Sequence, residues 1–195
     1  MESIQDQGAG LTYREELPLA IEPQAESGGK HHWIQLNAGN EMLLRACLAI
    51  YDHREPEEHD EVMQELTRLD LKLNLLLNVV QQLAVAQSPQ PQPVPVTLTA
   101  EGVSWPERFG PCLVSAGAGT QQLAGEALVR VNIYISPLVA LPLSFDGYFD
   151  KVEIEGGSAE WQCKFASASP VVSELLEKLI FSFHRREVAQ ERAAG

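Results

Sequence analysis

Between Asp60 and Gln87 the large apolar residues recur at steps that alternate between four and three positions. The seven positions are Val62, Leu66, Leu69, Leu73, Leu76, Val80 and Leu83. This alternation has a period of about 3.5 residues, which keeps one seam of an α-helix against a partner helix as the two supercoil. We therefore predict a helix of about 42 Å, at 1.5 Å per residue, that associates with copies of itself as an oligomeric coiled coil.

The apolar face of this helix is broader than a two-stranded coil requires, because Met63, Leu77 and Val79 lie beside the seam. A broad apolar face and leucine at most seam positions favour a tetramer. A dimer of helical hairpins would also bring four helices together. The remaining alternative is a long helix that packs only within its own chain.

A proline-rich stretch, SPQPQPVPV, follows the helix and predicts an extended connector with a boundary at Pro89. From Val94 onward apolar and polar residues alternate, as in half-buried strands. The predicted strands cover residues 94–99, 103–105, 128–136, 141–145, 148–154 and 161–165, with turns at 116–119, 146–147 and 156–157. Short strands at this spacing indicate a small barrel or sandwich.

A further strand is predicted near the N-terminus, where Leu17, Leu19 and Ile21 alternate in ELPLAIEP. Pro18 is expected at a sheet edge or near the start of that strand. The segment QAESGGKHHW is predicted to be a loop. His31 and His32 within it have no metal-ligand partner at a suitable spacing, so we expect them on the surface.

Two shorter helices are also predicted. Residues 37–40 offer an N-cap for a first helix over residues 41–54, which ends near Pro56. At the C-terminus, Ser169 can cap a helix that has Pro170 in its first turn. The apolar stripe of this helix consists of Val172, Leu175, Leu176, Leu179, Ile180 and Phe183. We expect the stripe to cover the barrel or to pack on the other helices.

The 195-residue chain has 27 acidic and 14 basic residues, a formal net charge of −13. This charge argues against binding of nucleic acid or anionic lipid, which requires basic patches. No secretory signal pattern or uninterrupted apolar span is found, so we expect a cytoplasmic protein without membrane insertion. Cys47, Cys112 and Cys163 are far apart, which predicts free thiols rather than a disulfide framework.

The sequence contains none of the patterns typical of a nucleophile elbow, a zinc-binding helix or a phosphate-binding loop. The glycine-containing stretch SAGAGTQQLAG is better explained as a flexible loop. The carboxylates are spread along the chain and are expected to face solvent. We therefore predict no catalytic residue, no metal site and no cofactor.

The order of these pieces resembles the PilZ domain family. In that family an arginine motif, RxxxR, and a strand motif, (D/N)xSxxG, together bind the bacterial second messenger cyclic di-GMP. Arg14 matches the first arginine, whereas Pro18 occupies the position of the second. In TLTAEG, Thr97 stands at the Asp or Asn position, Thr99 at the Ser position, and Gly102 matches the glycine.

The resemblance implies a small antiparallel six-stranded PilZ-like β-barrel. Together with the long heptad-repeat helix, which the periodicity predicts to form an oligomeric coiled coil, this gives an α+β protein. Residues 1–10 would be a flexible N-terminus. Residues 11–39 and 89–195 would form the barrel and the C-terminal helix, and residues 40–88 an inserted helical oligomerisation module.

The missing second guanidinium lowers the expected affinity for a dianionic ligand, since a hydrogen bond to a charged group contributes about 1.5–3 kcal/mol. Glu15 and Glu16 beside Arg14 add repulsion. We therefore predict a non-catalytic, tetrameric scaffold that has lost cyclic di-GMP binding and acts through protein partners. The resemblance implies roles in motility, type IV pili, biofilm or virulence. The alternative is a cyclic di-GMP receptor with a rearranged site that uses Arg14 with Arg108 or Arg130.

Overall fold

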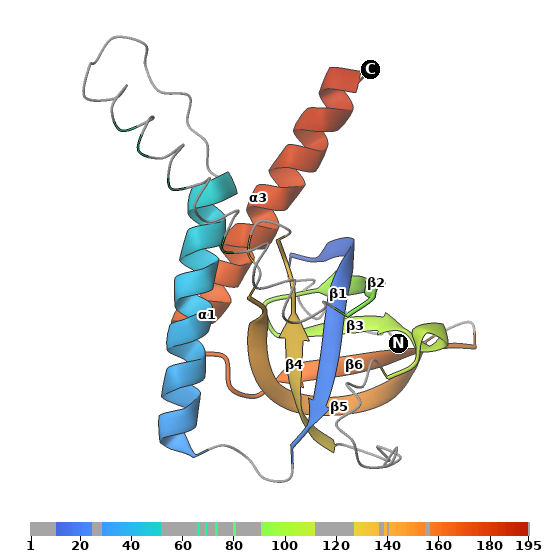
Figure 1. Ribbon diagram of the computed structural model, residues 1–195. Helices are drawn as coiled ribbons and strands as arrows, with labels where there is room; N and C mark the ends of the chain where they lie inside the picture. Colours follow the sequence, from blue (N-terminus) through green and yellow to red (C-terminus); the bar gives the residue numbers. More distant parts are fainter. Residues whose placement is uncertain are drawn as a thin grey trace, which may run out of the picture.

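The computed structural model describes residues 11–24, 29–51, 91–111, 127–136, 139, 141–154 and 157–194, together with Leu66, Leu69, Leu73 and Val80. Figure 1 shows a six-stranded barrel with two helices packed beside it. The elements in chain order are β1 (Tyr13–Pro23), α1 (Lys30–Tyr51), β2 (Pro93–Leu98), β3 (Gly102–Pro106), a 3₁₀ helix η1 (Glu107–Phe109), β4 (Ala127–Ile133), β5 (Leu143–Ile154), β6 (Ser158–Phe165) and α3 (Pro170–Ala194).

The barrel is closed, with the strand order β1-β2-β3-β6-β5-β4 and antiparallel pairing throughout. Closure depends on β1, whose first half, Tyr13–Pro18, pairs with β2 while its second half pairs with β4. Pro18 lies in the middle of the strand, at this change of partner, rather than at a sheet edge. Proline has no N–H to donate, but its carbonyl still accepts a hydrogen bond of 3.1 Å from the N–H of Tyr134.

Alternation along the strands fills the barrel interior, as the sequence predicts. In β4, Val129, Val131 and Ile133 are fully buried in the barrel interior, whereas Asn132 lies on the opposite face, where it is also buried and bonds to Ser144 and Glu22. The largest interior side chains are Trp105, Phe145 and Phe149. The predicted six-stranded barrel is therefore confirmed.

The predicted turn at Asp146 and Gly147 is wrong, because both residues lie inside the single long strand β5. A Cβ atom on Gly147 would lie 2.2 Å from the carbonyl oxygen of Lys164 on β6. The glycine therefore permits a close approach of two strands instead of a reversal of the chain. Gly157 does form the predicted turn between β5 and β6, with a φ of 79°.

The predicted start of the first helix is also wrong. Helix α1 begins at Lys30, so the predicted loop residues His31 and His32 lie in its first turn, and Asn40 lies in its middle. Asn37 does not cap α1 either: its side-chain amide donates to the carbonyl of Ser167, and its oxygen accepts from the N–H of Ser169. These asparagines are used to attach α1 to the barrel.

Asn40 closes a gap in the hydrogen bonding of the barrel. β5 pairs with β6 only from Gly147 onward, so Ser144 has β4 as its only strand neighbour. The Asn40 side chain donates to the Ser144 carbonyl at 2.7 Å and accepts from its N–H at 2.9 Å. Asn40 is only 3% exposed, and its amide takes the place of a peptide group from a missing strand.

The C-terminal helix agrees with the prediction. The Ser169 hydroxyl accepts a hydrogen bond from the N–H of Val172, which is an N-cap interaction. All six residues of the predicted apolar stripe are buried, and they pack against α1 and the barrel. Neither α1 nor α3, the two long helices of the described part of the chain, is apolar enough to span a membrane. The predicted turn at residues 116–119 lies outside the described residues.

We expect Asn40→Ala to lower the free energy of unfolding by about 1–3 kcal/mol, because it leaves two backbone groups of Ser144 without these hydrogen bonds. Glu41→Ala is the matched control, since Glu41 only pairs with Arg45 at the surface, and it should change stability by less than about 0.5 kcal/mol. Urea unfolding measures both. Equal midpoints for Asn40→Ala and wild type would contradict the role of Asn40.

Candidate functional site

The positions that match the ligand motifs come together on the outer face of the barrel. Arg14 on β1 lies opposite Thr97 on β2, and Thr97 lies opposite Ser104 on β3. Directly opposite residues of an antiparallel pair share one face of the sheet. Arg14 is exposed and Thr97 is half-buried, so these two motif positions lie side by side on the outer surface of the barrel.

The hydroxyl of Thr99 is already used within the turn between β2 and β3. Its oxygen accepts hydrogen bonds from the N–H groups of Glu101 and Gly102, at 3.2 and 3.1 Å. The hydroxyl also lies 3.2 Å from the Gly102 carbonyl oxygen, to which it can donate. Binding a ligand through Thr99 would compete with these contacts.

Gly102 is required by the packing of the barrel. A Cβ atom at this position would lie 2.5 Å from the carbonyl oxygen of Cys163 on β6. Cys163 is buried and lies directly opposite Val103, the residue that follows Gly102 on β3. The absence of a side chain at Gly102 therefore lets β3 and β6 approach each other, independently of any ligand.

The other arginines proposed to complete a rearranged site are distant or engaged. Arg130 on β4 lies directly opposite Glu22 on β1. Glu22 is eight residues from Arg14 along β1, a length of roughly 26 Å in an extended strand. The Arg130 Nε atom lies 2.9 Å from Oδ1 of Asp146. Arg108 is in η1, with its guanidinium 5.0 Å from the ring centre of Phe109.

Arg130 belongs to a polar cluster that attaches the start of α1 to β5. The Nε2 atom of His32 lies 2.9 Å from Oδ2 of Asp146 and 2.6 Å from Nη2 of Arg130. Without a proton Nε2 accepts from Arg130, and with a proton it donates to Asp146. Asp146 is buried, whereas the His32 side chain is 34% exposed. His32 therefore lies at the surface, as predicted, but it has a carboxylate partner that the sequence did not reveal. No group of three potential metal ligands occurs among the described residues.

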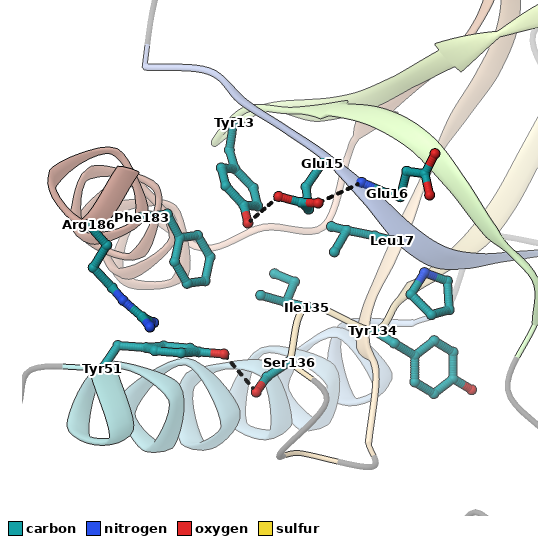
Figure 2. Close-up of a pocket in the computed structure, with 11 residues that line it drawn as sticks. Tyr13, Glu15, Glu16, Leu17, Tyr51, Tyr134, Ile135, Ser136, Phe183 and Arg186 are labelled. Carbon is teal, nitrogen blue, oxygen red and sulfur yellow. Dashed lines mark hydrogen bonds between the residues drawn. The ribbon is translucent and has the colours of Figure 1, made fainter. Parts of the chain in front are cut away.

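A pocket of about 380 Å³ lies where β1 and the segment after β4 meet the two helices (Figure 2). Three rings pack together on one side of it: Phe183 lies 4.6 Å from Tyr13 and 5.0 Å from Tyr51, measured between ring centres. The Arg186 guanidinium lies 5.0 Å from the centre of the Tyr51 ring, a cation–π contact. The Tyr51 hydroxyl donates to the Ser136 hydroxyl at 2.9 Å.

The electrostatics of this pocket are mixed. Glu15 and Glu16 lie on its rim opposite Arg186. Burial, followed by the charge of Glu15, raises the pKa of Tyr13 to about 12. The pocket therefore holds both signs of charge around an apolar floor that includes Leu17. Sequence reasoning missed this pocket, although Phe183 and Arg186 share one helix face, because the crossing of α1 and α3 is not encoded in local periodicity.

Four positions of the predicted heptad seam are described, and all four are helical and exposed. The exposed fractions are 51% for Leu66, 47% for Leu69, 57% for Leu73 and 61% for Val80. Val62, Leu76 and Leu83 lie outside the described residues. The described seam positions are thus available to another helix.

The thiols of Cys47 and Cys163 are free and buried, as predicted. Burial raises the pKa of Cys47 to about 11 and that of Cys163 to about 12, with a contribution from Asp146 at Cys163. Thiols with such pKa values carry little thiolate near neutral pH, which makes them poor nucleophiles. Cys112 lies outside the described residues.

Comparison with known proteins identifies two similarities. A family model described as "Atypical PilZ domain, cyclic di-GMP receptor" matches residues 44–193. Among solved structures, the chain is similar to a pathogenic protein from Xanthomonas campestris, described as a tetrameric PilZ domain self-assembled via an unusual helical bundle. The two chains share 22% sequence identity over 94% of this chain and 93% of that chain, with a TM-score of 0.66. No curated protein matches this chain.

We expect Gly102→Ala to destabilise the fold by about 1–3 kcal/mol, as overpacking does in a tight core. Gly39→Ala is the control, because a Cβ atom there meets nothing within 4 Å, and alanine in a helix should stabilise by about 0.5–1 kcal/mol. Thermal unfolding compares the two variants. If Gly102→Ala is as stable as wild type, the glycine is not required for strand packing.

Proposed function

The chain belongs to the atypical PilZ domain family, and we propose that it is a non-catalytic regulatory scaffold that assembles through its heptad helix and acts through protein partners. The observation that carries this proposal is the exposure of Leu66, Leu69, Leu73 and Val80 along one helical seam. Burying a half-exposed leucine against a partner stabilises an assembly by on the order of 1 kcal/mol. Several such residues in each chain favour association.

A tetramer is the assembly we favour. The breadth of the apolar face supports more than two helices, and the similar Xanthomonas campestris protein is described as tetrameric and self-assembled through a helical bundle. In this proposal residues 40–88 supply the assembly module. Residues 11–39 and 89–195 supply the barrel and the C-terminal helix. Helix α1 belongs to both parts, because it crosses the boundary at residues 39 and 40. The barrels would then be held around a central bundle in the cytoplasm.

Loss of cyclic di-GMP binding at the motif face is the second part of the proposal. Arg14 is the only motif arginine, and Glu15 and Glu16 follow it directly. Thr99 and Gly102 are occupied by the β2–β3 turn and by the approach of β6. A dianionic ligand would therefore find one guanidinium where the family pattern provides two. By resemblance to the family, the regulated process is motility, pilus function, biofilm or virulence.

The second candidate function is cyclic di-GMP reception through a rearranged site, and it is favoured by the family's description as a cyclic di-GMP receptor. It requires a second cation near Arg14. Arg130 lies opposite the far end of β1 from Arg14, and it forms an ion pair with Asp146. Arg108 is exposed and contacts Phe109, so of the two arginines named for a rearranged site Arg108 is the more available.

We expect Leu69→Glu combined with Leu73→Glu to reduce the particle from four chains to one while the barrel stays folded. Both side chains are about half exposed in a single chain, so the glutamates cost little there but introduce repulsion in an apolar seam. Light scattering after size-exclusion chromatography gives the mass, and circular dichroism checks the fold.

Met42→Glu is the matched control, because Met42 is 62% exposed on α1 and is not one of the seam residues. It should leave the mass unchanged. An unchanged mass for the double glutamate variant would contradict assembly through the seam, and a wild-type protein that is already monomeric would contradict the scaffold itself.

A further inference from the structure

A groove of about 660 Å³ is lined by residues of α1 and α3. Figure 1 shows that α3 continues past the barrel. Along the first half of α3 one face is buried against α1 and the barrel, whereas every residue from Arg185 to Gln190 is exposed. The C-terminal half of α3 diverges from α1 (Figure 1). The groove is separate from the motif face on β1 and β2.

The floor of this groove is apolar and partly open to solvent. Leu48 and Ala49 contribute from α1, and Phe181 and Ala189 from α3. The Phe181 side chain is 51% exposed, so a large part of its apolar surface is open to a partner. Small side chains at Ala49 and Ala189 leave room for the backbone of a third helix, which is how amphipathic helices enter such grooves.

All charged residues that line the groove, among those the structure describes, are cationic. They are Lys178, Arg185 and Arg186. The Arg186 guanidinium is already oriented over the Tyr51 ring. None of the described residues that line the groove is a carboxylate, although Lys178 pairs with Glu174 one turn away on α3, at 2.7 Å. In a chain with 27 acidic and only 14 basic residues, Arg185 and Arg186 therefore give this groove a local positive charge. Two arginines provide forked donors that match carboxylates well.

We propose that this groove binds an acidic amphipathic helix of a partner protein, with leucine-like side chains on Phe181 and Leu48 and glutamate or aspartate side chains on Lys178 and Arg185. The inference rests on the proposed function, in which the protein acts through protein partners. Charge complementarity selects this partner, because a basic helix would face three like charges and a neutral apolar helix would supply no counter-charge for Arg185.

The test uses the full-length protein and a fluorescein-labelled synthetic helix of about five turns, with leucines along one face and glutamates beside them. A second peptide carries lysines in place of the glutamates. Fluorescence anisotropy at low and high salt measures affinity. We expect the glutamate peptide to bind more weakly as salt increases, and the lysine peptide not to bind although the protein has a net charge of −13.

Two double charge reversals locate the site. Lys178→Glu with Arg185→Glu should weaken binding of the glutamate peptide by at least about tenfold. Arg108→Glu with Lys164→Glu makes the same change in net charge on exposed barrel residues and should weaken binding by less than about threefold, because distant surface charges are screened. Circular dichroism confirms that both variants are folded.

In the peptide experiments, three results would overturn the proposal: no binding of the glutamate peptide, equal binding of the lysine peptide, or equal losses in the two double variants. Light scattering on the groove variant separates this inference from self-assembly. If peptide binding is lost while the mass is unchanged, the groove serves a partner and the seam serves assembly. If the mass falls to one chain, the groove is occupied by a second copy and the proposed partner is wrong.

Discussion

The amide of Asn40, bonded to both backbone groups of Ser144, is the contact on which the arrangement of the molecule depends. A barrel of short strands leaves an edge where β6 stops and β5 continues, and an uncovered edge exposes unpaired donors and acceptors. Here a helix supplies the missing partner through one side chain. Asn37 and His32 attach the same helix to Ser167 and Asp146. Helix α1 is therefore part of the barrel's hydrogen bonding, and through its packing with α3 it fixes the pocket and the groove.

The family's ligand face shows how a binding motif can be retained as structure. Thr99 holds the β2–β3 turn, and Gly102 allows β6 to pack closely. Both residues would be needed for folding even if no ligand ever bound. What the face lacks is charge, since Arg14 is followed by two glutamates. The exposed apolar seam and the cationic groove lie on helices instead, so the surfaces that we propose for interaction are on the helices and not on the barrel.

Much of the fold could be predicted from local patterns. Alternation of apolar and polar residues predicted β4, and the Ser169 cap with its apolar stripe predicted α3, because in both cases the buried face follows the period of the element. The pair Asp146–Gly147 misled us, since the same dipeptide that forms turns also permits close strand contact and a buried ion pair. Asn40 misled us for a similar reason: asparagine is typical of helix caps, and only the distant edge of β5 explains it inside a helix. The pocket and the groove arise from the crossing of two helices, which no local period encodes.

Calorimetric titration of the full-length protein with cyclic di-GMP at low salt tests the central claim most directly, namely that the barrel keeps the family's fold without its ligand site. The account predicts no heat beyond dilution, so that any dissociation constant is weaker than about 1 mM. Binding with a dissociation constant on the order of 1 µM, abolished by Arg14→Ala, would contradict it. In that case the motif face would be a working receptor site, and Thr99 and Gly102 would serve both folding and ligand.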